Sequence, residues 1–276
     1  MMATSNRSAT GLLLMALACP SIAAAQAAAP PAQAPAPAAV DPHAAKPERP
    51  TVATHAFTVA PGWLEIETGA EFDRYADKTH GVAAPTLFKI GLAPNLQLDL
   101  QAPIVRPQGL SSTGIGDLSA GIKWHVMENA FLGDVAVQPT IKFATGASAD
   151  GMGTGTTDAS LLLISSHKLG AVSMDLNVGV TRRSGDGTDV PRTSTVWTAS
   201  FGGSAAGNVG WCAELFGYPA TSGPAGADAI VAVLAGPTWA ARDWLVFDAG
   251  VIVKLKGEQP NAIYAGMTWN VAGPRK

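Results

Sequence analysis

Ionisable side chains recur at every second position in several stretches of this chain. Glu65, Glu67, Glu71 and Asp73 follow this spacing within nine residues. Alternate residues of an extended strand project to the same face, so we expect such side chains to gather on one side of a sheet. The residues that we predict to line a polar interior are Glu65, Glu67, Glu71, Asp73, Asp99, Asp117, Lys123, His125, Lys142, Asp175, Arg183, Glu214, Asp248 and Lys254.

Two interpretations of these charges remain open. The first is that acids and bases pair and fill the interior, since an unpaired buried charge costs several kcal/mol. The second is that part of the acidic set stays unpaired and steers a solute through a water-filled path. Lys89 and Lys256 add to the bases available for pairing.

No pattern for catalysis or metal binding is legible. The glycine cluster at residues 151–155 has no helix pattern after it, which argues against a phosphate-binding loop, and a G-x-S-x-G nucleophile motif is absent. We therefore expect no enzymatic activity, no metal and no cofactor. The five histidines are far apart, with no i, i+4 pair: His43, His55, His80, His125 and His167.

The first 56 of the 276 residues do not have the pattern of a folded core. Residues 1–25 combine a polar start, a short apolar run and small residues before Gln26, which predicts a secretory signal peptide. Lipidation at Cys19 is the alternative. Residues 26–56 are rich in Ala and Pro, and we expect an extended, disordered lead.

Residues 57–276 predict one all-β domain. Residues 171–183 show the pattern clearly, with Val178 and its apolar neighbours on one face and Asn177 and other polar residues on the opposite face. Twelve such stretches predict an antiparallel, up-and-down transmembrane β-barrel. They are residues 63–74, 85–92, 96–105, 115–127, 134–145, 157–167, 171–183, 193–204, 209–218, 227–239, 244–256 and 262–271.

The connections between these stretches alternate between long and short, except for the last. Long loops of outer-membrane barrels lie outside the cell and short turns lie in the periplasm. A soluble β-sandwich, the rival fold, gives no reason for this alternation. The net charge of −3 argues against a nucleic-acid partner. After removal of the signal peptide Cys212 is the single cysteine, so no internal disulfide is expected.

Two motifs resemble those of the outer-membrane barrels named for the MetA pathway of phenol degradation. Residues 114–124, GIGDLSAGIKW, are similar to the G-x-G-D-L-x-x-G-x-K-aromatic strand of that family. Residues 142–146, KFATG, are similar to its K-x-P-T-G turn, with Ala144 in place of proline. The resemblance continues through residues 155–170 and covers most of residues 63–271. It implies a transporter or porin-like channel for small, often aromatic or hydrophobic, compounds.

The final strand resembles the signal read by the outer-membrane barrel assembly machinery, with Tyr264, Gly266, Trp269 and Val271 in the matching positions. We therefore expect a Gram-negative outer-membrane protein, surrounded by membrane lipid and lipopolysaccharide, that transports a small solute. A structural or adhesive barrel with a plugged lumen is the alternative function.

The loop assignment predicts a labelling result. Residues 146–156 and 184–192 are long connections rich in Gly and Asp, and we expect both outside the cell. Cysteines placed at Ser148 and Asp186 should therefore react with an impermeant maleimide on intact cells. Reaction only after permeabilisation of the outer membrane would reverse the predicted orientation.

Overall fold

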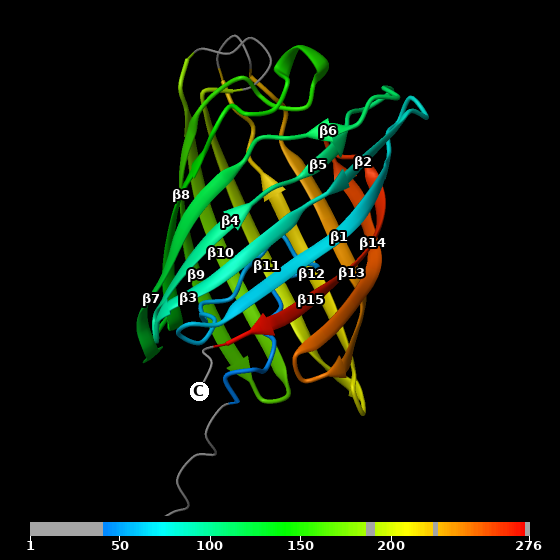
Figure 1. Ribbon diagram of the computed structural model, residues 1–276. Coiled ribbons are helices and arrows are strands. Elements are labelled where there is room, and N and C mark those ends of the chain that lie inside the picture. Colours follow the sequence, from blue (N-terminus) through cyan, green and yellow to red (C-terminus); the bar gives the residue numbers. More distant parts are fainter. Residues whose placement is uncertain (1–40, 186–190, 223–225, 274–276) are drawn as a thin grey trace, which may run out of the picture. The chain divides into compact units, whose positions relative to one another are not determined.

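The computed structural model describes residues 41–185, 191–222 and 226–273, which form a closed antiparallel β-barrel (Figure 1). Within these residues no helix is both long and apolar enough to cross a membrane. The strands are β1 (Leu64–Arg74), β2 (His80–Ala84), β3 (Thr86–Ala93), β4 (Leu96–Gln101), β5 (Ile104–Arg106), β6 (Gly114–Ile115), β7 (Ser119–Ala130), β8 (Gly133–Lys142), β9 (Asp158–Leu169), β10 (Val172–Arg183), β11 (Thr193–Ala206), β12 (Val209–Tyr218), β13 (Ile230–Arg242), β14 (Leu245–Lys256) and β15 (Asn261–Ala272).

These strands occupy twelve positions around the wall, because three positions are each built from two strands: β2 with β3, β4 with β5, and β6 with β7. β2 and β3 are separated at Pro85, and β4 and β5 at Ala102 and Pro103. Proline cannot donate to the ladder, yet the register is continuous across both breaks: Ala84 pairs with Ile104 and Leu87 with Gln101. The predicted twelve-stranded, all-β barrel is confirmed.

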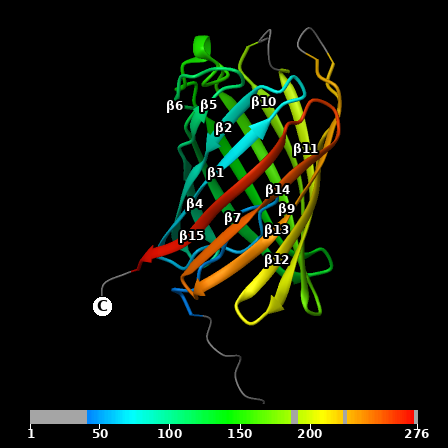
Figure 2. The same cartoon turned by 90° about the vertical axis from the view of Figure 1, so that its right-hand side faces the viewer.

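The first and last strands close the barrel. β1 pairs with β15 along its whole length, from Leu64 opposite Ala272 to Arg74 opposite Asn261 (Figure 2). Closure leaves no strand edge exposed along this seam, which a wall surrounded by lipid requires because lipid offers no hydrogen-bond partners. Gly69 lies directly opposite Gly266 in the middle of the seam.

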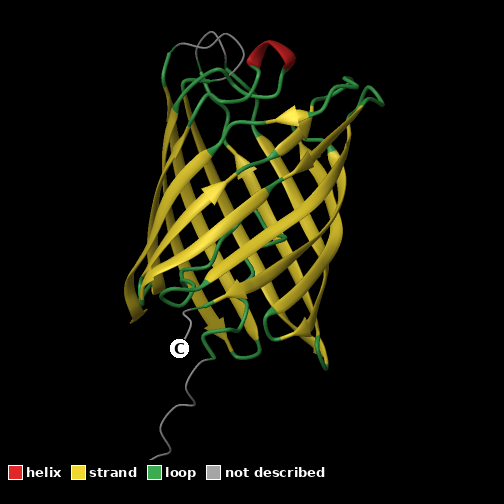
Figure 3. Cartoon of the chain, viewed as in Figure 1, coloured by secondary structure: helices red, strands yellow, loops and turns green. Residues whose placement is uncertain are grey.

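The connections differ in length between the two ends of the barrel (Figure 3). At one end, two-residue turns join β3 to β4, β7 to β8, β9 to β10, β11 to β12 and β13 to β14. Gly170 and Gly207 each begin such a turn with a positive φ, the conformation that tight hairpins demand. The long connections, including the 3-10 turn η1 (Ser148–Asp150), lie at the other end. Asp186, named above for labelling, lies outside the described residues.

The two faces of the wall have opposite chemistry. Val178, Leu163 and Ile263 point outward and are 59%, 51% and 61% exposed. Glu65 and Lys123 point inward and are fully buried. Apolar side chains outside and charged side chains inside are the reverse of a soluble protein, and match a barrel surrounded by lipid.

One prediction needs correction. Residues 41–56 are not a disordered lead: together with residues 57–62 they run inside the barrel, where Ala53 and Ala56 are buried. We call residues 41–62 the luminal segment; it is the blue stretch in the lower half of Figure 1. The sequence pattern failed here because the segment buries its backbone against polar wall residues and needs few apolar side chains of its own. Residues 1–40 lie outside the described residues.

The face assignment can be tested with two neighbouring residues of β4. Leu100 points outward, whereas Gln101 points inward and lines a cavity. Leu100→Arg should lower the free energy of unfolding by about 2–4 kcal/mol, since arginine is costly on the lipid side of a barrel, and Gln101→Arg by much less. Reversible unfolding in lipid vesicles measures both. Equal losses would contradict the assignment.

Candidate functional site: the barrel lumen

The luminal segment follows the inner wall around the barrel. Near its start, His43 stacks against Trp244 at 5.7 Å between ring centroids, and its Nε2 lies 3.0 Å from the carbonyl oxygen of Asn270. Near its end, the N–H of Val59 donates to Gln97 of β4 and the N–H of Gly62 donates to the carbonyl of Gly91. The segment then continues directly into β1.

Wall side chains accept most of the hydrogen bonds that the segment backbone donates. Each N–H that leaves water must find an acceptor, or it costs about 1–3 kcal/mol. Besides Gln97 of β4, the acceptors come from β1, β9, β10 and β12. The bonds run from Lys46 to Glu65 (2.8 Å), from Glu48 and Arg49 to Glu67 (2.8 and 3.1 Å), from Val52 and Ala53 to Glu214 (both 2.7 Å), from Thr54 to Asn177 (2.7 Å) and from Ala56 to Ser166 (2.8 Å).

Five charged groups form a buried charge cluster where the segment meets the wall: Glu48, Glu65, Glu67, Lys89 and Lys123. The Lys89 ammonium lies 2.6 Å from both Glu65 and Glu67 and 3.7 Å from Glu48, while Lys123 pairs with Glu48. Both lysine side chains are fully buried. Glu48 of the segment therefore supplies the carboxylate that Lys123 needs.

Two groups of the luminal segment have displaced pKa values. Burial raises the pKa of Glu48, but the positive charges of Lys123 and Lys89 outweigh it and hold that pKa well below its usual range. Burial, with the charge of Lys123, lowers the pKa of His55 to about 3, so the imidazole is neutral. The lowered pKa of Glu48 reflects stabilising ion pairs that are lost when the carboxylate is protonated, whereas the lowered pKa of His55 opposes docking once the free imidazole would be protonated. Both effects weaken the docked state as the pH falls.

Arg49 of the segment lies in a cradle at the closing seam. Its Nη2 and Nε lie 3.2 and 3.3 Å from the two carboxylate oxygens of Asp248 on β14. A Cβ added at Gly69 or Gly266 would come within 2.5 Å of the guanidinium. The paired glycines therefore make the room that this cation occupies. We call this place the Arg49 site.

A cavity of about 320 Å³ lies between the luminal segment and the wall. Residues 48–54 of the segment form one side, and Glu67, Glu71, Leu234 and Ile252 belong to the wall around it. Glu71 forms no ion pair within the described residues, although Asp73, two positions along β1, lies within hydrogen-bonding distance. The cavity is acidic on the β1 side.

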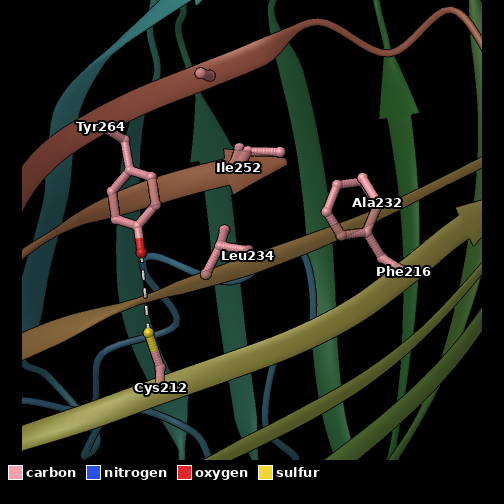
Figure 4. Close-up of a cluster of buried hydrophobic side chains, with 7 residues drawn as sticks. Cys212, Phe216, Ala232, Leu234, Ile252 and Tyr264 are labelled. Atoms are coloured by element: carbon pink, nitrogen blue, oxygen red, sulfur yellow. Dashed lines mark hydrogen bonds between the residues drawn. The ribbon is translucent and has the colours of Figure 1, made fainter. Parts of the chain in front are cut away.

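The part of the wall next to β1 is apolar. A cluster of inward-facing residues from β12, β13, β14 and β15, which we call the apolar wall, is buried in the lumen (Figure 4). The Tyr264 hydroxyl lies 4.0 Å from the Cys212 sulfur. This cluster was not predicted from the sequence, although residues 227–239 are apolar on both faces, which is the signal for it. Its members are Cys212, Phe216, Ala232, Leu234, Ile252, Ala262 and Tyr264.

A second charged group, the outer charge cluster, lies at the end of the barrel with the long loops: Asp117, Lys142, Asp158 and Arg183. Lys142 lies 2.6 Å from Asp117 and 3.3 Å from Asp158, and Arg183 lies 3.4 Å from Asp158. Asp117 also accepts hydrogen bonds from the N–H groups of Gly146 and Thr154. The cluster therefore joins the two family-like motifs and holds the loop at residues 146–156.

The structure separates the predicted interior residues into groups. Glu65, Glu67, Lys123, Glu214 and Asp248 contact the luminal segment, while Asp117, Lys142 and Arg183 meet in the outer charge cluster. Asp99 accepts hydrogen bonds from Gln97 and Gln138, and Asp175 from Ser166. His125 lies 3.4 Å from Asp134, and Lys254 lines a shallow pocket at the long-loop end. Within the described residues, no group of three His, Cys, Asp or Glu side chains could hold a metal ion.

The barrel is similar to solved structures of outer-membrane proteins. An outer-membrane channel from Pseudomonas putida F1 matches with a TM-score of 0.59 and 12% identity, over 78% of this chain and 97% of that one. That likeness shows a shared fold. OmpT of Vibrio cholerae, as a loop L8 deletion mutant, matches with a TM-score of 0.39 and 10% identity, over 75% and 97% of the chains. No protein-family model and no curated protein matches this chain.

The buried charge cluster predicts a large effect of one substitution. Lys89→Met leaves Glu65 and Glu67 buried without their base, so the free energy of unfolding should fall by about 3–5 kcal/mol. Lys168→Met, at an exposed lysine on β9, is the matched control and should change it little. Urea unfolding in vesicles compares the two. Similar losses would show that Lys89 is not held by the cluster.

Proposed function

We propose that this protein is an outer-membrane channel for passive uptake of small solutes, and that its luminal segment closes it. The observation that carries the proposal is a cavity of about 320 Å³ whose wall combines acidic residues of β1 with part of the apolar wall. A barrel that serves only as a membrane anchor needs no such space. The fold shared with the Pseudomonas putida F1 outer-membrane channel supports the same conclusion.

The outer membrane is the compartment that this proposal requires. The apolar outer face fits membrane lipid and, on the cell-surface side, lipopolysaccharide. The signal-like residues 1–25 would export the chain, and the final strand would be read by the barrel assembly machinery. Among the residues that the structure describes, no group suggests catalysis, and we propose transport and not an enzyme.

The solute class follows from the resemblance to the barrels of the MetA pathway of phenol degradation. Asp117 and Lys142, one from each motif, lie 2.6 Å apart. We propose membership of that family and small aromatic or hydrophobic solutes, to which the apolar wall offers a matching surface.

The luminal segment itself favours a second candidate, a structural or adhesive barrel with a plugged lumen. Its N–H groups are bound to six wall side chains, and it completes the buried charge cluster. A segment held this way could be permanent. Single-channel recording of the purified full-length protein in a planar bilayer separates the candidates, because a permanent plug gives no current under any condition.

Two acids on the inward face of β1, Glu71 and Asp73, predict selectivity. Glu71→Gln combined with Asp73→Asn should lower the cation-to-anion permeability ratio, since both carboxylates lie on the lumen wall of β1 and attract cations. The reversal potential in a salt gradient measures the ratio. Glu128→Gln, at an exposed residue beside a short turn, is the control and should leave it unchanged. Currents with an unchanged ratio in the double variant would refute the acidic path but leave a channel.

A further inference from the structure

The Arg49 site is a cation-binding site whose present occupant belongs to the chain itself. Three strands of the wall build it: Asp248 of β14 contributes both carboxylate oxygens, and Gly69 of β1 and Gly266 of β15 contribute the space. Asp248 is 3% exposed in its side chain and Arg49 is 15% exposed. The guanidinium is therefore seated in the wall, with one side open to the lumen.

The surroundings of this site match a particular kind of molecule. Arg49 lines the cavity together with Ile252 and Leu234 of the apolar wall. Asp248 and Ile252 share the inward face of β14, about 13 Å apart along the strand, and Tyr264 of the apolar wall lies over Gly250 between them, so the apolar surface extends from Ile252 toward the carboxylate. An organic cation with an apolar body fits both surfaces at once, whereas an anion would meet Asp248, Glu67 and Glu71.

We propose that the lumen binds guanidinium or ammonium compounds with an apolar body, and that such a solute competes with Arg49 for Asp248. The inference rests on the proposed channel function and names both a solute class and the way it opens the path. In the closed state Arg49, which is part of the chain, occupies the position that the solute's cationic group would take. When the solute takes its place, the luminal segment loses its contact with β14 and its docked state is weakened.

The competition has a thermodynamic basis. A solute can shift the equilibrium between closed and open lumen only by its difference in affinity for the two states. Here that difference arises because Asp248 is occupied by Arg49 in the closed state and free in the open state. The remaining anchors of the segment, such as Glu214 and Asn177, bind backbone groups and do not depend on the solute's charge.

The test uses the full-length protein in a planar bilayer with four probes. Benzylguanidinium has the cation and the apolar body, benzylurea is its neutral isostere, phenylacetate is an anion of similar size, and guanidinium lacks the apolar body. Benzylguanidinium should raise the open probability in a saturable way. Guanidinium should need about tenfold higher concentrations, because it buries no ring. Benzylurea and phenylacetate should have no effect at the same concentrations.

Variants of Arg49 and Asp248 test whether the response depends on this site. Arg49→Gln removes the internal competitor, so basal opening should rise and the Kd of benzylguanidinium should fall about tenfold, as expected when the binding-competent state becomes well populated. Asp248→Asn should abolish the response, while Asp248→Glu should retain it and shows that the barrel folds. Arg242→Gln, at an exposed arginine at the end of β13, is the control and should respond like the unmodified protein.

The possible outcomes separate this inference from the channel proposal. Equal responses to benzylguanidinium and benzylurea, with clear currents, would overturn the cation site and leave the channel intact. A benzylguanidinium response that survives in Asp248→Asn would overturn the site as well. No current from any form, Arg49→Gln included, would refute the channel proposal and this inference with it.

Discussion

The pairing of buried charges across the lumen is the constraint on which the interior depends. Lys89 and Lys123 are fully buried, and a buried ammonium is stable only beside carboxylates that compensate its lost hydration. The wall alone supplies Glu65 and Glu67, which serve Lys89. Lys123 is paired with Glu48, so the wall is electrostatically complete only when the luminal segment is docked.

The same constraint explains why a segment with few apolar residues is ordered inside a barrel. Its order comes from hydrogen bonds and charges that the wall provides at fixed positions, and not from a hydrophobic core of its own. Such contacts are directional and individually exchangeable with water. They can hold a segment in one place and still allow it to leave, which a tightly packed apolar plug would make more difficult.

The lumen has two environments because strands in different parts of its wall differ in sequence pattern. β1 and β4 alternate strictly, so their inward faces are polar. In β13 both faces are apolar, and Leu234 and Ala232 point inward. A solute in the cavity therefore meets acids of β1 and hydrocarbon of β13 and β14 on neighbouring parts of the wall. This asymmetry, more than the size of the cavity, limits which molecules fit.

Much of the barrel could be predicted from the sequence. The alternation in residues 171–183 correctly placed Val178 outside and Asn177 inside, since a period of two allows only two face assignments and lipid decides between them. The long and short connections predicted the two ends. We did not predict that two short strands, separated at Pro85 or near Pro103, would share one position in the wall. In the sequence, a proline that ends a strand gives the same pattern as a proline that only interrupts one.

The local pattern of the chain by itself determined the strands, their number and their faces, because each depends on residues adjacent in sequence. Only the tertiary structure decided what the interior residues contact. Glu48 meets Lys123, and Arg49 meets Asp248, 199 residues away, through the curvature and register of a closed wall. A periodic sequence pattern contains no information about contacts between residues so far apart in the chain. The position of the luminal segment, its cation site and the cavity beside it are therefore determined only by the closed barrel.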